Sequence, residues 1–278
     1  MIAILWSLFG AFTYGISDFI GALAARKSSA WPVAFVTAVG AAVTSALLAL
    51  DHPGSPAASH FAWAAFAGIG GGMGVAFLYR GLAKGRMGVV APTSAVGAAV
   101  LPVLVSTATG EHPPPLAWVG IVAALPGILL VSIEEGSSIG GPGLGDGLVA
   151  GAGFGVSFIG LGHVPESAGW WPLVITNIAS AVAVLLVGKA LRQHVFSREP
   201  AVYVGLAGGV LAAAAMVAFV LATSRGLVSI ASVLVSLYPA VTVALAVALL
   251  HERVQRSQRV GMALCAVAVA LVAASGRG

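Results

Sequence analysis

Long stretches without a single charged side chain dominate this sequence, and they restrict what it can fold into. Residues 87–110 and 200–224, for example, contain no Asp, Glu, Lys or Arg. A helix of about 20 predominantly apolar residues is long enough to cross the hydrocarbon core of a bilayer. Only 8% of the 278 residues are charged, whereas a typical soluble domain has roughly 25%. The sequence therefore predicts an integral membrane protein.

Ten candidate membrane spans can be distinguished, separated by short connections. They cover approximately residues 2–23, 31–50, 61–80, 88–108, 115–133, 146–162, 170–189, 201–223, 227–250 and 258–275. The longest connection, 134–146, is polar and rich in glycine, which is typical of a flexible linker. It separates five spans from the other five.

The two halves of the chain resemble each other in sequence. The stretch YGISDFIG (14–21) is matched by FGVSFIG (154–160), which lacks the aspartate. Near the end of each half, Gly120 and Gly261 occupy matching places, 141 positions apart. A register that is kept from the first span of each half to the last indicates an internal duplication.

Because each half has an odd number of spans, the second half enters the membrane from the side opposite to the first. Inverted repeats of this kind are common in secondary transporters, which bind substrate near the bilayer midplane. We therefore predict an all-α integral membrane fold with ten transmembrane helices in two inverted five-helix repeats. The first repeat covers 3–132, the linker 133–145 and the second repeat 146–274.

The basic residues predict the topology. Of the 13 Lys and Arg residues, 11 fall in connections that follow odd-numbered spans, and only Arg225 and Arg277 fall on the other side. The positive-inside rule makes the basic side cytoplasmic and places both termini outside. Because the basic residues lie between apolar runs and form no patch with exposed aromatic residues, nucleic-acid binding is not expected.

The closing stretch 238–273 resembles the end of an EamA domain, from the drug/metabolite transporter superfamily. It contains a proline within a helix, small and branched residues, an acidic turn at His251-Glu252, and then Gln258 and Gly261. Family members usually have glycine before this glutamate. The first half keeps that pattern at Gly110-Glu111, and the second half departs from it at His251. The opening FGAFTYGISDFIGALAARK (9–27) is also similar to the first helix of many bacterial EamA proteins.

This resemblance covers 3–132 and 146–274, nearly the whole chain. It implies a bundle of ten helices with a central cavity lined by helices one, three, four, six, eight and nine. Family members export or import amino acids, other metabolites or toxic organic compounds. Their termini are commonly cytoplasmic, which is opposite to the orientation that the basic residues predict here.

Asp18 is the only Asp, Glu, Lys or Arg well inside a predicted span. An aspartate near the bilayer centre costs roughly 2.5–3.5 kcal/mol on insertion scales, so we predict that Asp18 faces a cavity or a partner and never lipid. Two roles are left open. The carboxylate could take up a proton or hold a cationic group during transport. Alternatively, it could pair with Arg26, Arg80 or Lys84 and so hold the helices together at the basic side of the protein.

The other candidate residues for substrate binding or coupling are hydroxyl and aromatic side chains. They are Tyr14, Ser17, Phe154 and Ser157 from the two motif copies, Thr93 and Ser94 in the fourth span, and Ser232 and Ser236 in the ninth span. The fourth and ninth spans contain proline, which removes a backbone hydrogen bond and frees a carbonyl group. The alternative for the hydroxyl residues is helix packing. For Thr176, Asn177 and Ser180 we favour an interhelical hydrogen bond over ligand binding.

These features predict a secondary active transporter of a small organic solute, such as a metabolite, an amino acid or a drug-like compound. It would work by alternating access around a midplane cavity, and we expect an exporter in a bacterial inner or plasma membrane. An integral-membrane enzyme acting on lipid would need a His, Asp, Glu or Cys constellation near an interface, and the sequence has none. A non-transporting protein that senses lipid would not need inverted symmetry.

The expected partners are the solute and the lipid bilayer. No catalytic residue or cofactor is expected. A metal site is not expected either, because no two of the six histidines are spaced three or four positions apart. Coupling to protons or another ion and the formation of a homodimer are left open.

Overall fold

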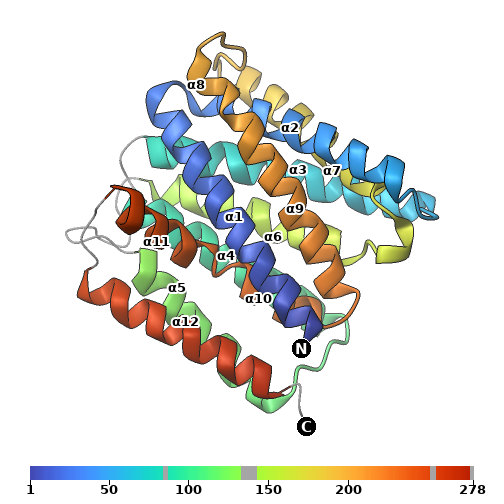
Figure 1. The fold of residues 1–278 in the computed structure, drawn as a ribbon, viewed down its shortest axis with the longest axis vertical. Coiled ribbons are helices and arrows are strands. Elements are labelled where there is room, and N and C mark those ends of the chain that lie inside the picture. Colours follow the sequence, from blue (N-terminus) through green and yellow to red (C-terminus); the bar gives the residue numbers. More distant parts are fainter. Residues whose placement is uncertain (84–86, 133–142, 251–254, 276–278) are drawn as a thin grey trace.

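The computed structural model describes residues 1–83, 87–132, 143–250 and 255–275. These residues form a bundle of helices without strands (Figure 1). The helices of the first half are α1 (Ile2–Lys27), α2 (Ala30–Asp51), α3 (Ala58–Ala83), α4 (Met87–Ala108) and α5 (Pro115–Ser132). Those of the second half are α6 (Leu144–Gly162), the short η1 (Glu166–Ala168), α7 (Trp171–Ala190), α8 (Pro200–Tyr203), α9 (Gly205–Thr223), α10 (Val228–Val235), α11 (Tyr238–Leu250) and α12 (Arg256–Ser275).

Within the described residues, seven helical segments are long and apolar enough to cross a membrane. They are α1, α2, α3, α6, α7, the α8–α9 pair and α12. Shorter apolar helical segments at 93–108, 115–130 and 228–242 correspond to the fourth, fifth and ninth predicted spans. The prediction of a multi-pass membrane protein is confirmed, and the count of ten crossings stays a prediction.

The predicted linker 133–145 lies mostly outside the described residues. Its last two residues, 144 and 145, belong to α6. Helix α6 therefore begins earlier than the span that the sequence predicted.

The glycine run 68–74 packs α3 closely against α6 and α7. A Cβ atom at Gly70 would lie 2.6 Å from the carbonyl oxygen of Gly153 in α6, and one at Gly68 would lie 2.1 Å from that of Thr176 in α7. Small residues at helix interfaces allow backbones to approach this closely.

Helix α9 packs on α1 and α2 in the corresponding way. The Ser17 hydroxyl in α1 donates a hydrogen bond of 2.9 Å to the carbonyl oxygen of Gly208 in α9. A Cβ atom at Gly209 would lie 2.4 Å from the carbonyl oxygen of Thr37 in α2. Helix α9 therefore packs on α1 and α2 as α3 packs on α6 and α7. One helix of each repeat thus packs on two helices of the other repeat, as expected of two repeats related by a two-fold axis.

The contact between α5 and α12 follows the offset of 141 positions. A Cβ atom at Gly120 would lie 3.0 Å from the carbonyl oxygen of Ala268, and one at Gly127 would lie 3.2 Å from that of Gly261. Adding 141 to 120 and 127 gives 261 and 268, so the offset converts each contact into the other. The register found in the sequence therefore also relates contacts in the structure.

The first helices of the two halves run in opposite directions. Gly160 lies against Ala67 and Gly153 against Gly70, so α6 runs antiparallel to α3. Helix α2 reverses the chain between α1 and α3, which makes α1 and α3 run the same way (Figure 1). Consequently α1 and α6 are antiparallel.

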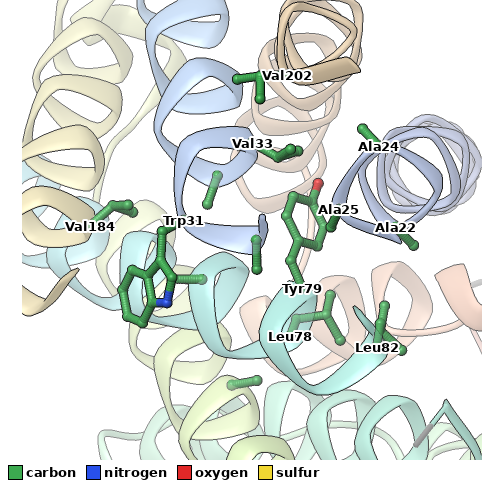
Figure 2. Close-up of a cluster of buried hydrophobic side chains, with 14 of the residues drawn as sticks. Ala22, Ala24, Ala25, Trp31, Val33, Leu78, Tyr79, Leu82, Val184 and Val202 are labelled. Carbon is green, nitrogen blue, oxygen red and sulfur yellow. The ribbon is translucent and has the colours of Figure 1, made fainter. Parts of the chain in front are cut away.

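A cluster of buried apolar side chains joins α1, α2 and α3 near the C-terminal ends of α1 and α3 (Figure 2). Trp31 and Tyr79 are the largest fully buried side chains there. The ring of Tyr79 extends from α3 toward α1, where a Cβ atom at Gly21 would lie only 2.1 Å from the tyrosine hydroxyl. The last glycine of YGISDFIG therefore makes room for this ring.

Candidate functional site

A cavity lies between the two halves of the bundle. Helices α1, α2 and α3 line it from the first half, and α6, α7, α9 and the start of α11 line it from the second. The family resemblance implied a contribution from the fourth helix, but no described residue of α4 lines this cavity, whereas α2 and α7 do. Its volume is about 50 Å³, which is room for a few water molecules and far less than the roughly 300–1,000 Å³ of ligand pockets.

The two copies of the repeated motif meet at this cavity. Tyr14, Ser17 and Asp18 line it from α1, and Phe154 and Ser157 line it from α6. All five are residues that the sequence proposed for binding or coupling. The structure therefore brings together side chains that are about 140 positions apart because the fold places equivalent helices on opposite sides of one cavity.

The side chain of Asp18 is buried and faces the cavity, as predicted. Among the residues that the structure describes, none forms a hydrogen bond or an ion pair with its carboxylate. Three tyrosines, Tyr14, Tyr79 and Tyr238, line the same cavity as Asp18. These tyrosines come from α1, α3 and α11, so both halves contribute to the surroundings of Asp18.

Two buried hydroxyl groups beside Asp18 have no hydrogen-bond partner in the described part of the chain, namely Tyr79 Oη and Thr37 Oγ1. A Cβ atom at Gly208 in α9 would lie 3.6 Å from Ser17 Oγ and 3.8 Å from Thr37 Oγ1, so the hydroxyls of Ser17 and Thr37 lie on the same side of α9. A buried polar group without a partner costs about 1–3 kcal/mol. Both side chains line the cavity, where a ligand or water could satisfy them.

The structure gives Arg80 a partner other than Asp18. Its Nε donates a hydrogen bond of 3.0 Å to Oδ1 of Asp146 in α6, and its guanidinium carbon lies 4.2 Å from the ring centroid of Phe77. The hypothesis that Asp18 pairs with Arg80 is therefore wrong. Lys84, another proposed partner, lies outside the described residues.

Neither of the two hydroxyl residues predicted in the fourth span, Thr93 and Ser94, lines the cavity. Ser94 lies directly behind its wall, with Oγ 3.3 Å from the hydroxyl of Tyr238. Thr93 packs against α6, where a Cβ atom at Gly147 would lie 2.8 Å from the Cβ of Thr93. A substrate contact of Thr93 or Ser94 stays a prediction.

The predicted serines of the ninth span also lie away from the cavity wall. The Ser232 hydroxyl donates to the carbonyl oxygen of Ser229 at 3.1 Å, and Ser236 Oγ is buried without a partner among the described residues. The helix is interrupted here, because α10 ends at Val235 and α11 begins at Tyr238. The interruption lies next to Pro239 of the ninth span, and substrate contacts of Ser232 and Ser236 stay a prediction.

Asn177 forms the interhelical hydrogen bond that the sequence favoured. Its Nδ2 donates to Ser45 Oγ of α2 at 3.1 Å. Asn177 and Ser180 also line the cavity, so packing and cavity lining are not exclusive here.

Sequence reasoning did not select Thr37, Tyr79 or Tyr238 for the cavity. A tyrosine in an apolar span does indicate a buried hydroxyl that needs a partner, and this signal could have identified Tyr79 and Tyr238.

At the opposite end of the bundle from Arg80, Glu111 joins the two halves. Its Oε1 and Oε2 accept hydrogen bonds from the backbone N–H groups of Val228 and Ser229, at 2.7 and 3.0 Å. These N–H groups belong to the first turn of α10. A carboxylate there accepts hydrogen bonds from the free N–H donors and interacts favourably with the positive end of the helix dipole. The glutamate of the Gly110-Glu111 pair thus caps a helix of the other repeat. Its counterpart, Glu252, lies outside the described residues.

Comparison with known proteins gives a family and a fold. The model of the EamA-like transporter family matches residues 1–133 and 142–274. A solved structure titled only "Crystal structure of protein" is similar over 98% of this chain and 97% of that chain, with a TM-score of 0.71 and 18% sequence identity. That likeness shows the fold alone. No curated protein matches the chain.

Proposed function

Because the chain belongs to the EamA-like transporter family, we propose that it is a secondary active transporter of a small organic solute that works by alternating access around the Asp18 cavity. The family match indicates a transporter of small solutes, of the drug/metabolite transporter type. The observation that carries the proposal is the position of Asp18, whose carboxylate has no partner among the described residues and faces a cavity built by both repeats. We further propose export across a bacterial inner membrane.

The antiparallel directions of α1 and α6 support an arrangement of two inverted repeats with ten crossings. In such transporters the repeats move against each other around a fixed site. A cavity of about 50 Å³ is too small for a metabolite. Solute binding therefore requires the repeats to move apart at one end of the bundle.

Two polar contacts between the repeats are suited to control these movements. Arg80 of α3 pairs with Asp146 of α6 at one end, and Glu111 caps α10 at the other. Each contact joins one repeat to the other, so opening either end would separate the partners there. We propose that the two contacts break alternately during transport.

Asp18 is suited to couple transport to a proton. When the cavity opens to water, the carboxylate can release or take up a proton, and its charge then changes the affinity for solute. Replacing it by asparagine keeps the shape and removes the charge. We expect Asp18→Asn to abolish uphill transport while the protein remains folded.

The test is solute flux in proteoliposomes that contain the purified full-length protein, with an imposed pH gradient and a panel of amino acids, organic amines and organic acids. We expect wild type to accumulate at least one solute and Asp18→Asn to accumulate none. Asp51→Asn, at the exposed end of α2, is the matched control and should transport normally. If no solute moves, the proposal of a transporter is contradicted. If Asp18→Asn accumulates solute as wild type does, Asp18 is not the coupling group.

A further inference from the structure

We infer that the solute is an organic ammonium ion with an apolar body, and that its charged nitrogen binds Asp18. This inference rests on the proposed function, because it concerns the solute of the same cavity. It goes further in naming the charge and the apolar character that the cavity wall favours.

The charge of the described cavity wall favours a cation. Asp18 is the only charged residue among the described lining residues, which include no Lys, Arg or His. An ionised carboxylate buried without a counter-charge is costly, and a bound cation removes that cost. An anion or a zwitterion would instead bring a second carboxylate to a wall whose described residues carry no positive charge. Arg80, a nearby basic residue on a lining helix, already pairs with Asp146.

The aromatic residues around Asp18 suit the same ligand. Tyr14, Tyr79 and Tyr238 line the cavity together with Asp18, and Phe154 and Phe158 complete the aromatic part of the wall. Ammonium groups are attracted to the faces of aromatic rings, most strongly where water is excluded. A carboxylate among several aromatic rings is therefore a suitable site for an ammonium group attached to an apolar body.

The phenylalanine part of the wall is held in place by ring packing. The ring of Phe158 stacks on that of Phe219, with centroids 4.7 Å apart. The centroid of the Tyr14 ring lies 6.3 Å from that of the Phe158 ring. Phe219 is fully buried, so it supports the lining ring from behind. Such support fixes the Phe158 ring, which can contact the apolar body of the ligand once the cavity has opened.

The hydroxyls of Tyr79 and Thr37, which have no hydrogen-bond partner in the described part of the chain, provide a second, independent indication of a ligand. Both side chains are more than nine-tenths buried, at 0% and 4% exposure, and both line the cavity. A primary ammonium group has three N–H donors. One can bind the Asp18 carboxylate, and the others can reach hydroxyl oxygens on α2 and α3.

The experiment uses ligands that share one aromatic body and differ in charge. Binding to the purified full-length protein in detergent micelles is measured by equilibrium dialysis, with empty micelles as the blank. The cations are 2-phenylethylammonium and its N,N,N-trimethyl derivative. The other ligands are phenylalanine (zwitterion), 3-phenylpropionate (anion) and 2-phenylethanol (neutral). The trimethyl derivative keeps its charge at every pH and donates no N–H hydrogen bond.

We expect both cations to bind at least about tenfold more tightly than the neutral, zwitterionic and anionic ligands, because only they compensate the Asp18 charge. Asp18→Asn should remove this preference and leave the binding of 2-phenylethanol unchanged. Tyr79→Phe should weaken binding of the primary ammonium ion but not of its trimethyl derivative. The thermal unfolding of each variant shows that it is folded.

Three results would overturn the inference: cations that do not bind, cations that bind Asp18→Asn as tightly as wild type, or phenylalanine or 3-phenylpropionate that binds as tightly as the cations. None of these results contradicts transport itself, which the flux panel tests separately. Flux of an anionic or neutral solute with no binding of the cations would reject the ammonium solute and retain the transporter.

Discussion

Replacing Gly153 by valine should prevent the two repeats from packing and leave little folded protein. A Cβ atom at this position would lie 2.5 Å from the carbonyl oxygen of Gly70 and 2.7 Å from the backbone nitrogen of Gly74. Both neighbours are backbone atoms of α3, so no side chain can turn away to make room. Overpacking in a core typically costs about 1–3 kcal/mol, and we expect a loss at or above the upper end of this range.

Gly145→Val in the same helix is the matched control, because nothing lies within 4 Å of a Cβ atom at Gly145. Thermal unfolding and size-exclusion chromatography in detergent would compare the two variants. We expect the control to behave as wild type and Gly153→Val to unfold at a much lower temperature or to aggregate. A Gly153→Val variant as stable as the control would show that α3 and α6 do not cross this closely.

Replacing Asp146 by asparagine should destabilise the protein, whereas the same replacement of Asp18 should not. Both residues are 8% exposed, so burial alone does not distinguish them. Asp146 is the ion-pair partner of Arg80, and its loss leaves a guanidinium group without a counter-charge. Asp18 has no such partner among the described residues, so its replacement removes an uncompensated charge.

The side chains of Arg80 and Asp146 are 27% and 11% exposed. Breaking a fully buried ion pair costs about 3–5 kcal/mol, and exposed pairs contribute about 0–1 kcal/mol. We therefore expect Asp146→Asn to lose about 1–3 kcal/mol, and Asp18→Asn to be as stable as wild type or more stable. Thermal unfolding of both variants in one detergent measures the difference. An equal loss of stability in both variants would mean that Asp18 has a structural partner. It would favour the alternative in which Asp18 pairs with a basic residue and holds the helices together.

The sequence contained enough information to predict the repeat, because the duplication left an offset that can be read directly. The same offset of 141 positions relates the contact of Gly120 with Ala268 to that of Gly127 with Gly261. The position of Asp18 could also be predicted, since the cost of a carboxylate in lipid excludes a lipid-facing side chain. Both predictions depended on strong and general constraints.

Other parts of the site could not be predicted, because they depend on how helices are rotated and paired. A tyrosine in an apolar span indicates a buried hydroxyl, but the sequence does not tell whether a buried hydroxyl lines the cavity, as that of Tyr79 does, or lies behind its wall, as that of Ser94 does. Arg80 pairs with Asp146, 66 positions away and in the other repeat. Such a choice among distant partners follows from the packing of α3 on α6 and not from the neighbouring residues.

Proline residues were an incomplete guide to helix interruption. Residues 236 and 237 separate α10 from α11 close to Pro239, whereas α4 is continuous although it contains Pro92 and Pro102. Equivalent helices of the two repeats therefore differ in shape. Neighbouring groups can satisfy a carbonyl that a proline frees, so a proline alone does not require a break.

The most direct test of the account is whether the Asp18 cavity opens to both sides of the membrane. Cys265, the only cysteine, is first replaced by alanine, and Ala38 in the cavity wall is then replaced by cysteine. A membrane-impermeant thiol reagent is added to right-side-out and to inverted vesicles. Leu47→Cys, on an outward-facing part of the same helix, is the control and should not react, because lipid excludes the reagent.

Alternating access predicts that the cysteine at position 38 reacts in both kinds of vesicle, because the repeats separate at each end in turn. Labelling from only one side, or from neither, in fully folded protein would contradict alternating access at this cavity.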